Sequence, residues 1–214
     1  RLGVPLTEYA SVIGSYTLNF DDITLDEGIY FSDRQNPPLF ECDPLLAGRY
    51  LCDAIGKRTS SILGLTVALD TTDSRVRPTR GRAVSVTTEF AGLGGDTKYV
   101  RVRGRAAQFW PIGGGFIFSL SGEGGAIRSF EDARGPGQDK VRLTDRFFLG
   151  EPQIRGFDIR GVGPRVLRYP YDPETQTFIT DRDRIGDDAI GGNAYYLGRA
   201  EIEIPLGSGA RELG

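Results

Sequence analysis

Apolar and polar side chains alternate through most of this sequence, and helical periodicity is hard to find. Alternation with a period of two is typical of β-strands that have one apolar face. It covers six segments, each predicted to form a strand: residues 10–20, 62–70, 83–90, 100–106, 116–121 and 196–204. In the fourth segment, Arg101, Arg103 and Arg105 form a basic row opposite an apolar face. The pattern therefore predicts an all-β, antiparallel fold.

The predicted strands and their connections favour a transmembrane barrel. About ten residues at ~3.3 Å each, tilted by ~40°, rise about 25 Å, which is the height of the apolar band of an outer-membrane barrel. The connections are long at residues 21–58 and 123–193 and short at residues 71–81, 91–96 and 111–115. Such barrels keep short turns on the periplasmic side and long loops outside, and this order fits one orientation throughout. A soluble β-sandwich, whose strands also alternate, is the alternative.

Composition excludes several classes of chemistry. The chain has no His and only two Cys, so it cannot build a Ser-His-Asp triad, a His-ligated metal site or a Cys-rich zinc site. A formal net charge of −3 gives no electrostatic reason to propose nucleic acid as a partner. We therefore predict no enzyme activity, no cofactor and no metal site. The chain also lacks Met, which predicts a processed product or a fragment.

The most specific sequence lies in the long connection at residues 123–193. Gln153-Ile154-Arg155-Gly156-Phe157 is followed by Gly163-Pro164-Arg165 and then by Asp187-Asp188-Ala189-Ile190-Gly191-Gly192-Asn193-Ala194. Earlier in the chain, Asp70, Asp73, Pro78 and Gly81 have the form D-x-x-D with a later P-x-x-G. In this order and spacing, the segments resemble the BamA family of outer-membrane assembly barrels, the bacterial surface antigen barrels. The resemblance covers essentially the whole chain.

The resemblance implies a partial barrel. Residues 1–214 would form about strands seven to twelve of a sixteen-stranded barrel, with residues 123–193 as a long loop inside the lumen. The implied function is the folding and insertion of β-barrel proteins in the bacterial outer membrane, without enzyme chemistry. The implied partners are unfolded outer-membrane protein clients, accessory assembly lipoproteins and outer-membrane lipid.

The resemblance also implies a lumenal clamp made of Arg155, Gly156, Phe157 and Glu201. In the family, the arginine of the long loop meets acidic groups on the inner barrel wall. Arg155 is that arginine by motif, and the alternation independently places Glu201 on the polar, inward face. Gly156 would permit close backbone approach, and Phe157 would pack against the wall. A solvated loop arginine is the alternative for Arg155.

Two further groups of residues carry structural predictions. Cys42 and Cys52 lie in the first long loop, where an oxidising location permits a disulfide, with two unpaired thiols as the alternative. The row of Arg101, Arg103 and Arg105 is expected to pair in the lumen with Glu89, Glu123 or acids of the loop, and a strip that guides substrate is the alternative.

Three other functions remain open at this stage. A related barrel could serve protein translocation or secretion, as a TamA-like factor or a two-partner secretion pore. A passive porin would have loops that constrict the pore but would lack the Arg-Gly-Phe context. A soluble β-sandwich binding module would come from a different class altogether.

Overall fold

A computed structural model describes residues 1–32, 40–132, 139–172, 174–175 and 177–205. Seven strands form one antiparallel sheet in the order β1-β2-β5-β6-β7-β8-β13. Their bounds are β1 (Leu2–Pro5), β2 (Ala10–Ile23), β5 (Gly56–Asp70), β6 (Gly81–Gly95), β7 (Tyr99–Gly113), β8 (Phe116–Ser129) and β13 (Ala194–Glu203). Each strand of this sheet pairs with the sheet strand that follows it in the chain, and two of these pairs, β2–β5 and β8–β13, are joined by long loops.

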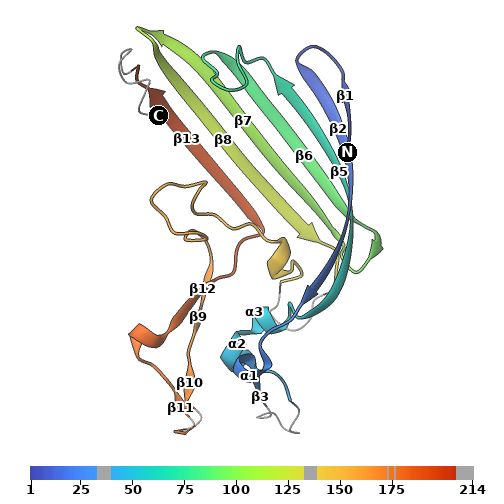
Figure 1. Ribbon diagram of the computed structural model, residues 1–214, viewed down its shortest axis with the longest axis vertical. Helices are drawn as coiled ribbons and strands as arrows, with labels where there is room; N and C mark the ends of the chain where they lie inside the picture. Colours follow the sequence, from blue (N-terminus) through green and yellow to red (C-terminus); the bar gives the residue numbers. More distant parts are fainter. Residues whose placement is uncertain (33–39, 133–138, 173, 176, 206–214) are drawn as a thin grey trace.

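Both long loops lie at one end of the sheet, as the sequence predicts. The turns after β1, β5 and β7 lie at one end, which we call the turn end (Figure 1). The loops after β2 and β8, together with the short β6–β7 connection, lie at the other, which we call the loop end (Figure 1). The antiparallel order of the strands makes successive connections alternate between these two ends.

The two long loops contain short elements of their own. The loop after β2 holds α1 (Glu27–Tyr30), β3 (Phe31–Ser32), β4 (Glu41–Cys42), α2 (Pro44–Ala47) and α3 (Arg49–Cys52). The loop after β8 holds the 3₁₀ turns η1 (Leu143–Asp145) and η2 (Arg182–Arg184) and the strands β9 (Arg165–Arg168), β10 (Tyr171–Asp172), β11 (Thr177–Phe178) and β12 (Gly186–Ala189). Within the described residues, none of the helices is long and apolar enough to cross a membrane.

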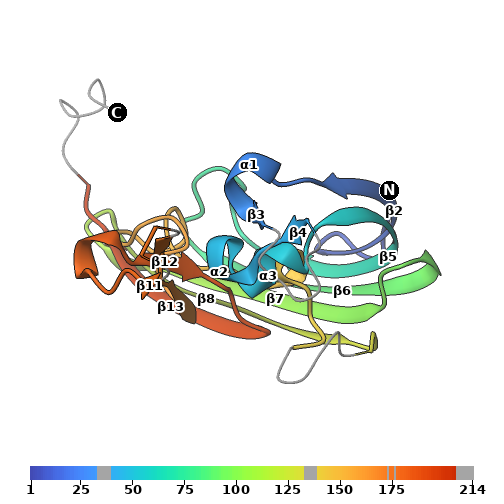
Figure 2. The ribbon, with the colours of Figure 1, turned by 90° about the horizontal axis from the view of Figure 1, so that it is seen from below.

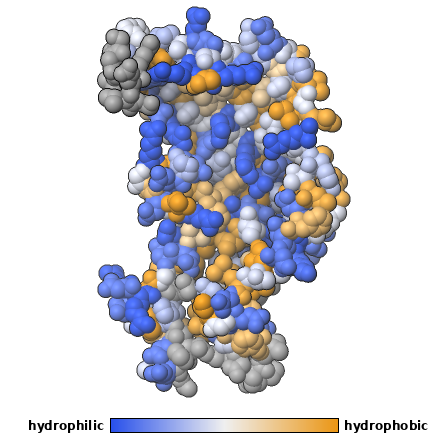
Figure 3. Space-filling view, in the orientation of Figure 1, coloured by the Kyte–Doolittle hydropathy of each residue, from blue (hydrophilic) through white to orange (hydrophobic). Residues whose placement is uncertain are grey.

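The sheet is curved, and its two faces differ in chemistry. Figure 2 shows the loops and short helices over the concave face. On the convex face, apolar side chains stand exposed, each between 37% and 59%: Leu63, Leu65, Val67, Val84, Val86, Phe90, Val102, Leu120 and Ile202. The concave face, seen in Figure 3, carries many hydrophilic side chains. The alternation in the sequence is thus an alternation between these two faces.

The sandwich alternative does not fit this architecture. Within the described residues, the other three sheets have two strands each, and none forms a second layer against the seven-stranded sheet. The small buried core lies instead at the loop end, on the concave face. It consists of Ala91, Tyr99, Ile127 and Val141, with Ile62 and Phe147 packed against it.

The strands extend further than the alternation predicts, reaching 14 or 15 residues in β2, β5, β6, β7 and β8. The long loop was predicted to begin at residue 123, but β8 continues to Ser129. Gly124 and Gly125, which read as a turn in the sequence, lie within β8 and pair with Tyr196 and Tyr195 of β13, the last strand of the sheet. This prediction was wrong because two adjacent glycines also suit a strand onto which other groups pack closely.

Candidate functional site on the concave face

The arginine row of β7 lies on the concave face and pairs largely as expected. Arg101 Nε donates to Glu89 Oε2 at 2.5 Å, and both side chains are largely buried. Arg105 places Nε and Nη2 at 3.1 and 3.0 Å from Glu123 Oε2. Arg103 lies over the ring of Phe147, 5.7 Å from its centroid, and thus contacts the long loop. The row neutralises acids of neighbouring strands and supports the loop.

The long loop returns to the sheet over the two glycines of β8. The Phe147 ring packs against Tyr195 with centroids 4.8 Å apart, and Phe147 exchanges backbone hydrogen bonds with Gly192. A Cβ at Gly125 would lie 2.8 Å from the Tyr195 ring and 3.1 Å from Phe147. A side chain at this position would therefore displace the aromatic pair that seats the loop.

A buried arginine joins the first part of the long loop to the sheet. We call this part, residues 139–147, the loop root. Arg58 of β5 donates from Nε to Thr97 Oγ1 and from Nη1 to Thr144 Oγ1, both at 2.7 Å. Its Nη2 lies 2.6 Å from Asp145 Oδ2 in η1, with side chains only 7% and 13% exposed. One guanidinium thus connects a strand, the β6–β7 turn and the loop.

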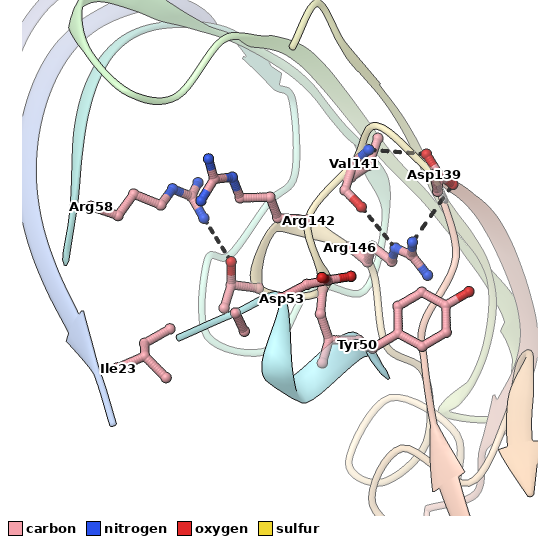
Figure 4. A pocket seen from close by; sticks show the side chains of 11 residues that line it. Ile23, Tyr50, Asp53, Arg58, Asp139, Val141, Arg142 and Arg146 are labelled. Carbon is pink, nitrogen blue, oxygen red and sulfur yellow. Dashed lines mark hydrogen bonds and ion pairs between the residues drawn. The ribbon is translucent and has the colours of Figure 1, made fainter. Parts of the chain in front are cut away.

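A second arginine, Arg146, holds the same root from the other side. Its guanidinium donates to the carbonyl oxygens of Val141 and Ile190 at 3.1 Å, lies 3.8 Å from Asp139 Oδ2, and stacks 5.1 Å from the Tyr50 ring centroid. Figure 4 shows these groups around a narrow cavity of about 20 Å³, with Arg58 on its opposite side. The two long loops therefore meet above the concave face.

The Arg-Gly-Phe motif lies near the turn end of β13, in residues 153–157, which we call the loop tip. Arg155 Nη1 lies 3.9 Å from Glu201 Oε1, with side chains 91% and 54% exposed. Nearby, Arg199 of β13 donates to the carbonyl oxygen of Gln153. The structure thus brings Arg155 and Glu201 together, at a distance that is longer than a hydrogen bond.

The other two residues of the expected clamp differ in detail from the expectation. Gly156 has φ +85°, and a Cβ there would meet nothing within 4 Å. Its glycine is therefore required by the left-handed backbone rather than by a close approach. Phe157 is 51% exposed.

Cys42 and Cys52 form the expected disulfide, which closes the segment containing α2 against β4. Asp43 begins α2 as its N-cap, accepting from the Leu45 backbone N–H at 2.8 Å. The bond lies within the loop after β2 and joins the end of β4 to the end of α3.

The turn between β5 and β6 is closed by the aspartates of the D-x-x-D segment. Asp73 accepts from the backbone N–H groups of Thr79 and Arg80 at 2.8 and 3.2 Å and from the Thr79 hydroxyl at 2.5 Å. These donors favour the charged carboxylate and lower the pKa of Asp73 to about 2.

Sequence reasoning did not single out the residues at the loop root, namely Arg58, Asp145, Arg146, Phe147 and Tyr195. Arg58 has the same parity along the strand as Ser60 and Ile62, so extending the predicted strand by four residues would have placed it on the concave face. Its partners lie 39, 86 and 87 residues away along the chain. No local pattern could identify them.

Comparisons with known proteins agree on one family. Residues 1–212 match the Omp85 superfamily domain. The chain is 34% identical over 152 residues to the outer membrane protein assembly factor BamA of Neorickettsia risticii (strain Illinois), covering 71% of this chain and 17% of that protein. It is 27% identical over 193 residues to the protein of the same name from Nitratidesulfovibrio vulgaris, covering 89% and 20%.

A solved structure has the same fold. The crystal structure of BamA from Haemophilus ducreyi lacking POTRA domains 1–3 matches with a TM-score of 0.63 at 18% identity, covering 95% of this chain and 36% of that one. The chain described above spans about a fifth of the length of the two curated relatives.

Proposed function

Because the chain belongs to the Omp85 superfamily, we propose that it is part of a transmembrane barrel that folds and inserts β-barrel proteins into the bacterial outer membrane. The observation that carries the proposal is the 34% identity to a protein named as an outer membrane protein assembly factor. Its partners are unfolded outer-membrane protein clients, accessory assembly lipoproteins and outer-membrane lipid.

The two faces of the sheet support a membrane location. A row of exposed Leu, Val, Phe and Ile side chains on the convex face is costly in water and favourable against lipid tails. Each backbone N–H and C=O group in lipid must be paired, so a client strand gains stability by adding to a sheet edge. This work needs no catalytic residue, and the chain acts without enzyme chemistry.

The loop tip acts in this proposal as a clamp on the inner wall. Arg155 would hold Glu201 of β13, with Gly156 supplying the left-handed turn and Phe157 covering the wall beside them. The separation of 3.9 Å between Arg155 Nη1 and Glu201 Oε1, on the concave face of the sheet, supports this assignment. With both side chains largely exposed, the pair contributes only about 0–1 kcal/mol as it stands. The clamp therefore selects a loop position rather than stabilising the fold.

A complementation experiment tests the function and the clamp together. The full-length protein carrying Arg155→Ala is expressed in cells depleted of their own copy, and the amount of folded outer-membrane barrels is measured by gel mobility. We expect less folded barrel protein and faster protease cleavage of the loop than with Arg182→Ala, an exposed arginine of η2 in the same loop. Unchanged barrel levels together with unchanged cleavage would contradict the clamp, and failure of the unmutated protein to complement would contradict the assembly function.

A further inference from the structure

The turn between β5 and β6, residues 71–80, reaches a strand that is not its neighbour. Arg77 Nη2 lies 2.6 Å from Glu203 Oε1 on β13. In the sheet, β6, β7 and β8 separate β5 from β13. The turn therefore crosses the concave face at the turn end instead of extending away from the sheet, as Figure 1 shows at the top of the molecule.

The turn is held in a defined shape that presents Arg77. Asp73 closes it through Thr79 and Arg80, and Ser74 Oγ accepts from the Arg77 backbone N–H at 3.2 Å. Gly81, at its end, has φ +101°, and a Cβ there would lie 2.3 Å from the Thr71 carbonyl oxygen. The backbone position of Arg77 is thus set by the turn itself.

Two cations from opposite ends of the sheet meet two neighbouring carboxylates on one strand. Glu201 and Glu203 are two residues apart, so their side chains share one face of β13. Arg155 approaches Glu201 from the long loop, and Arg77 approaches Glu203 from the turn. Residues of the turn, of β7, β8 and β13 and of the loop tip together line an open cavity of about 550 Å³.

We propose that the 71–80 turn is a closing element of the lumen, held to β13 by the Arg77–Glu203 pair, and that Arg77 is a positioning residue for the loop tip. Glu203 lies two residues from Glu201 on the same face of β13, so its pairing with Arg77 leaves Arg155 to Glu201 alone. When the turn is released, Glu203 competes with Glu201 for Arg155, and the loop tip loses its single position. The inference rests on the proposed clamp, whereas the Arg77–Glu203 contact is observed directly in the structure. Because both side chains are more than half exposed, the pair shifts an opening equilibrium only about two- to five-fold, which makes the closure reversible.

A thiol reporter at the loop tip tests this coupling in the full-length protein in membranes. Cys42 and Cys52 are joined in a disulfide, so Ile154→Cys adds a reactive thiol to this part of the chain. Ile154 is partly buried beside Arg155, so its labelling by a maleimide can rise. We expect Arg77→Glu to raise the labelling rate about two- to five-fold, the range for an exposed ion pair. The matched control is Arg75→Glu, because Arg75 lies in the same turn, is 89% exposed and lies 4.0 Å from Asp70 instead.

A charge exchange completes the test. Arg77→Glu combined with Glu203→Arg should return labelling to the rate of the unmutated turn, because the pair is restored with reversed polarity. Equal rates for Arg77→Glu and Arg75→Glu, or no rescue by the exchange, would overturn the inference. Labelling does not depend on client folding, so a failure of the assembly function in the complementation experiment leaves this readout separate.

Discussion

At the scale of single residues, arginine rather than lysine holds the concave face together. Every cation described at the loop root and in the β7 row is an arginine. Arg58 uses three of its nitrogens for three different partners. A planar guanidinium can direct several N–H groups in fixed directions, whereas an ammonium is a point charge on a flexible stem. The loop root is therefore specified by geometry as well as by charge.

Removing the Arg58 guanidinium should destabilise the protein strongly. Arg58→Ala leaves Asp145 as a buried charge without its partner, which typically costs about 3–5 kcal/mol. Arg58→Lys should cost less stability than Arg58→Ala but more than no substitution, since lysine keeps the positive charge but lacks the planar guanidinium. Urea unfolding of the full-length barrel in detergent measures the change, with Arg75→Ala as an exposed control that should stay within about 0.5 kcal/mol. Equal stability of the Arg58→Ala and Arg75→Ala proteins would show that the cluster does not anchor the loop.

At the scale of elements, the 71–80 turn shows how a short segment gains order without a core. Its closure depends on one carboxylate, that of Asp73, accepting from two backbone N–H groups and a hydroxyl. The same closure aims Arg77 at β13. A change in the charge of Asp73 should therefore alter the order of the whole turn.

The turn should lose order in acid. The folded pKa of Asp73, about 2, lies below the usual value, so its stabilising effect is complete above about pH 4 and disappears as the pH falls through about 2. Hydrogen-exchange protection of the Thr79 and Arg80 amides, corrected for intrinsic rates, should be constant above pH 4 and fall between pH 4 and pH 2. Asp73→Asn should lower protection at neutral pH and flatten this dependence. Full protection of the unmutated turn at pH 2 would refute the assignment.

The elements show how far sequence alone can reach. Alternation predicted the six longest strands and the order of long and short connections, because facing two different environments imposes a period of two. It did not predict that Gly124 and Gly125 lie within β8, since glycine has no side chain to show which face it occupies. Alternation placed Glu201 on the inward face, but the approach of Arg155 to it was expected only from the family resemblance. Arg58 and its partners were out of reach, because their contacts form only when the loop has folded back.

At the scale of the whole molecule, the curved sheet has one apolar face and one polar, charged face. The convex face carries apolar side chains and the concave face carries arginines, glutamates and the loops. Since successive residues of a strand face opposite sides, the same substitution should have very different effects at neighbouring positions.

Arginine scanning along β5 checks this separation. Leu65→Arg places a charge on the convex face and should cost about 2–4 kcal/mol if that face meets the middle of a bilayer. Ala68→Arg projects from the concave face of the same strand and should cost much less. The yield of folded full-length protein in lipid vesicles measures both. Similar losses at the two positions would contradict a lipid-facing convex surface.

The separation of β8 and β13 along the chain has a consequence for the order in which the sheet assembles. β7 and β8 meet through a two-residue connection, whereas Ala126 of β8 pairs with Ala194 of β13. Closing a loop of about 70 residues costs roughly 3 kcal/mol more chain entropy than closing one of two. Hairpins β5–β6 and β7–β8 should thus form early in folding. Strand β13 should pair late, after the long loop has packed over Gly124 and Gly125 of β8. The strand on which the loop tip and the turn converge would then be the last of the seven to acquire its native neighbours.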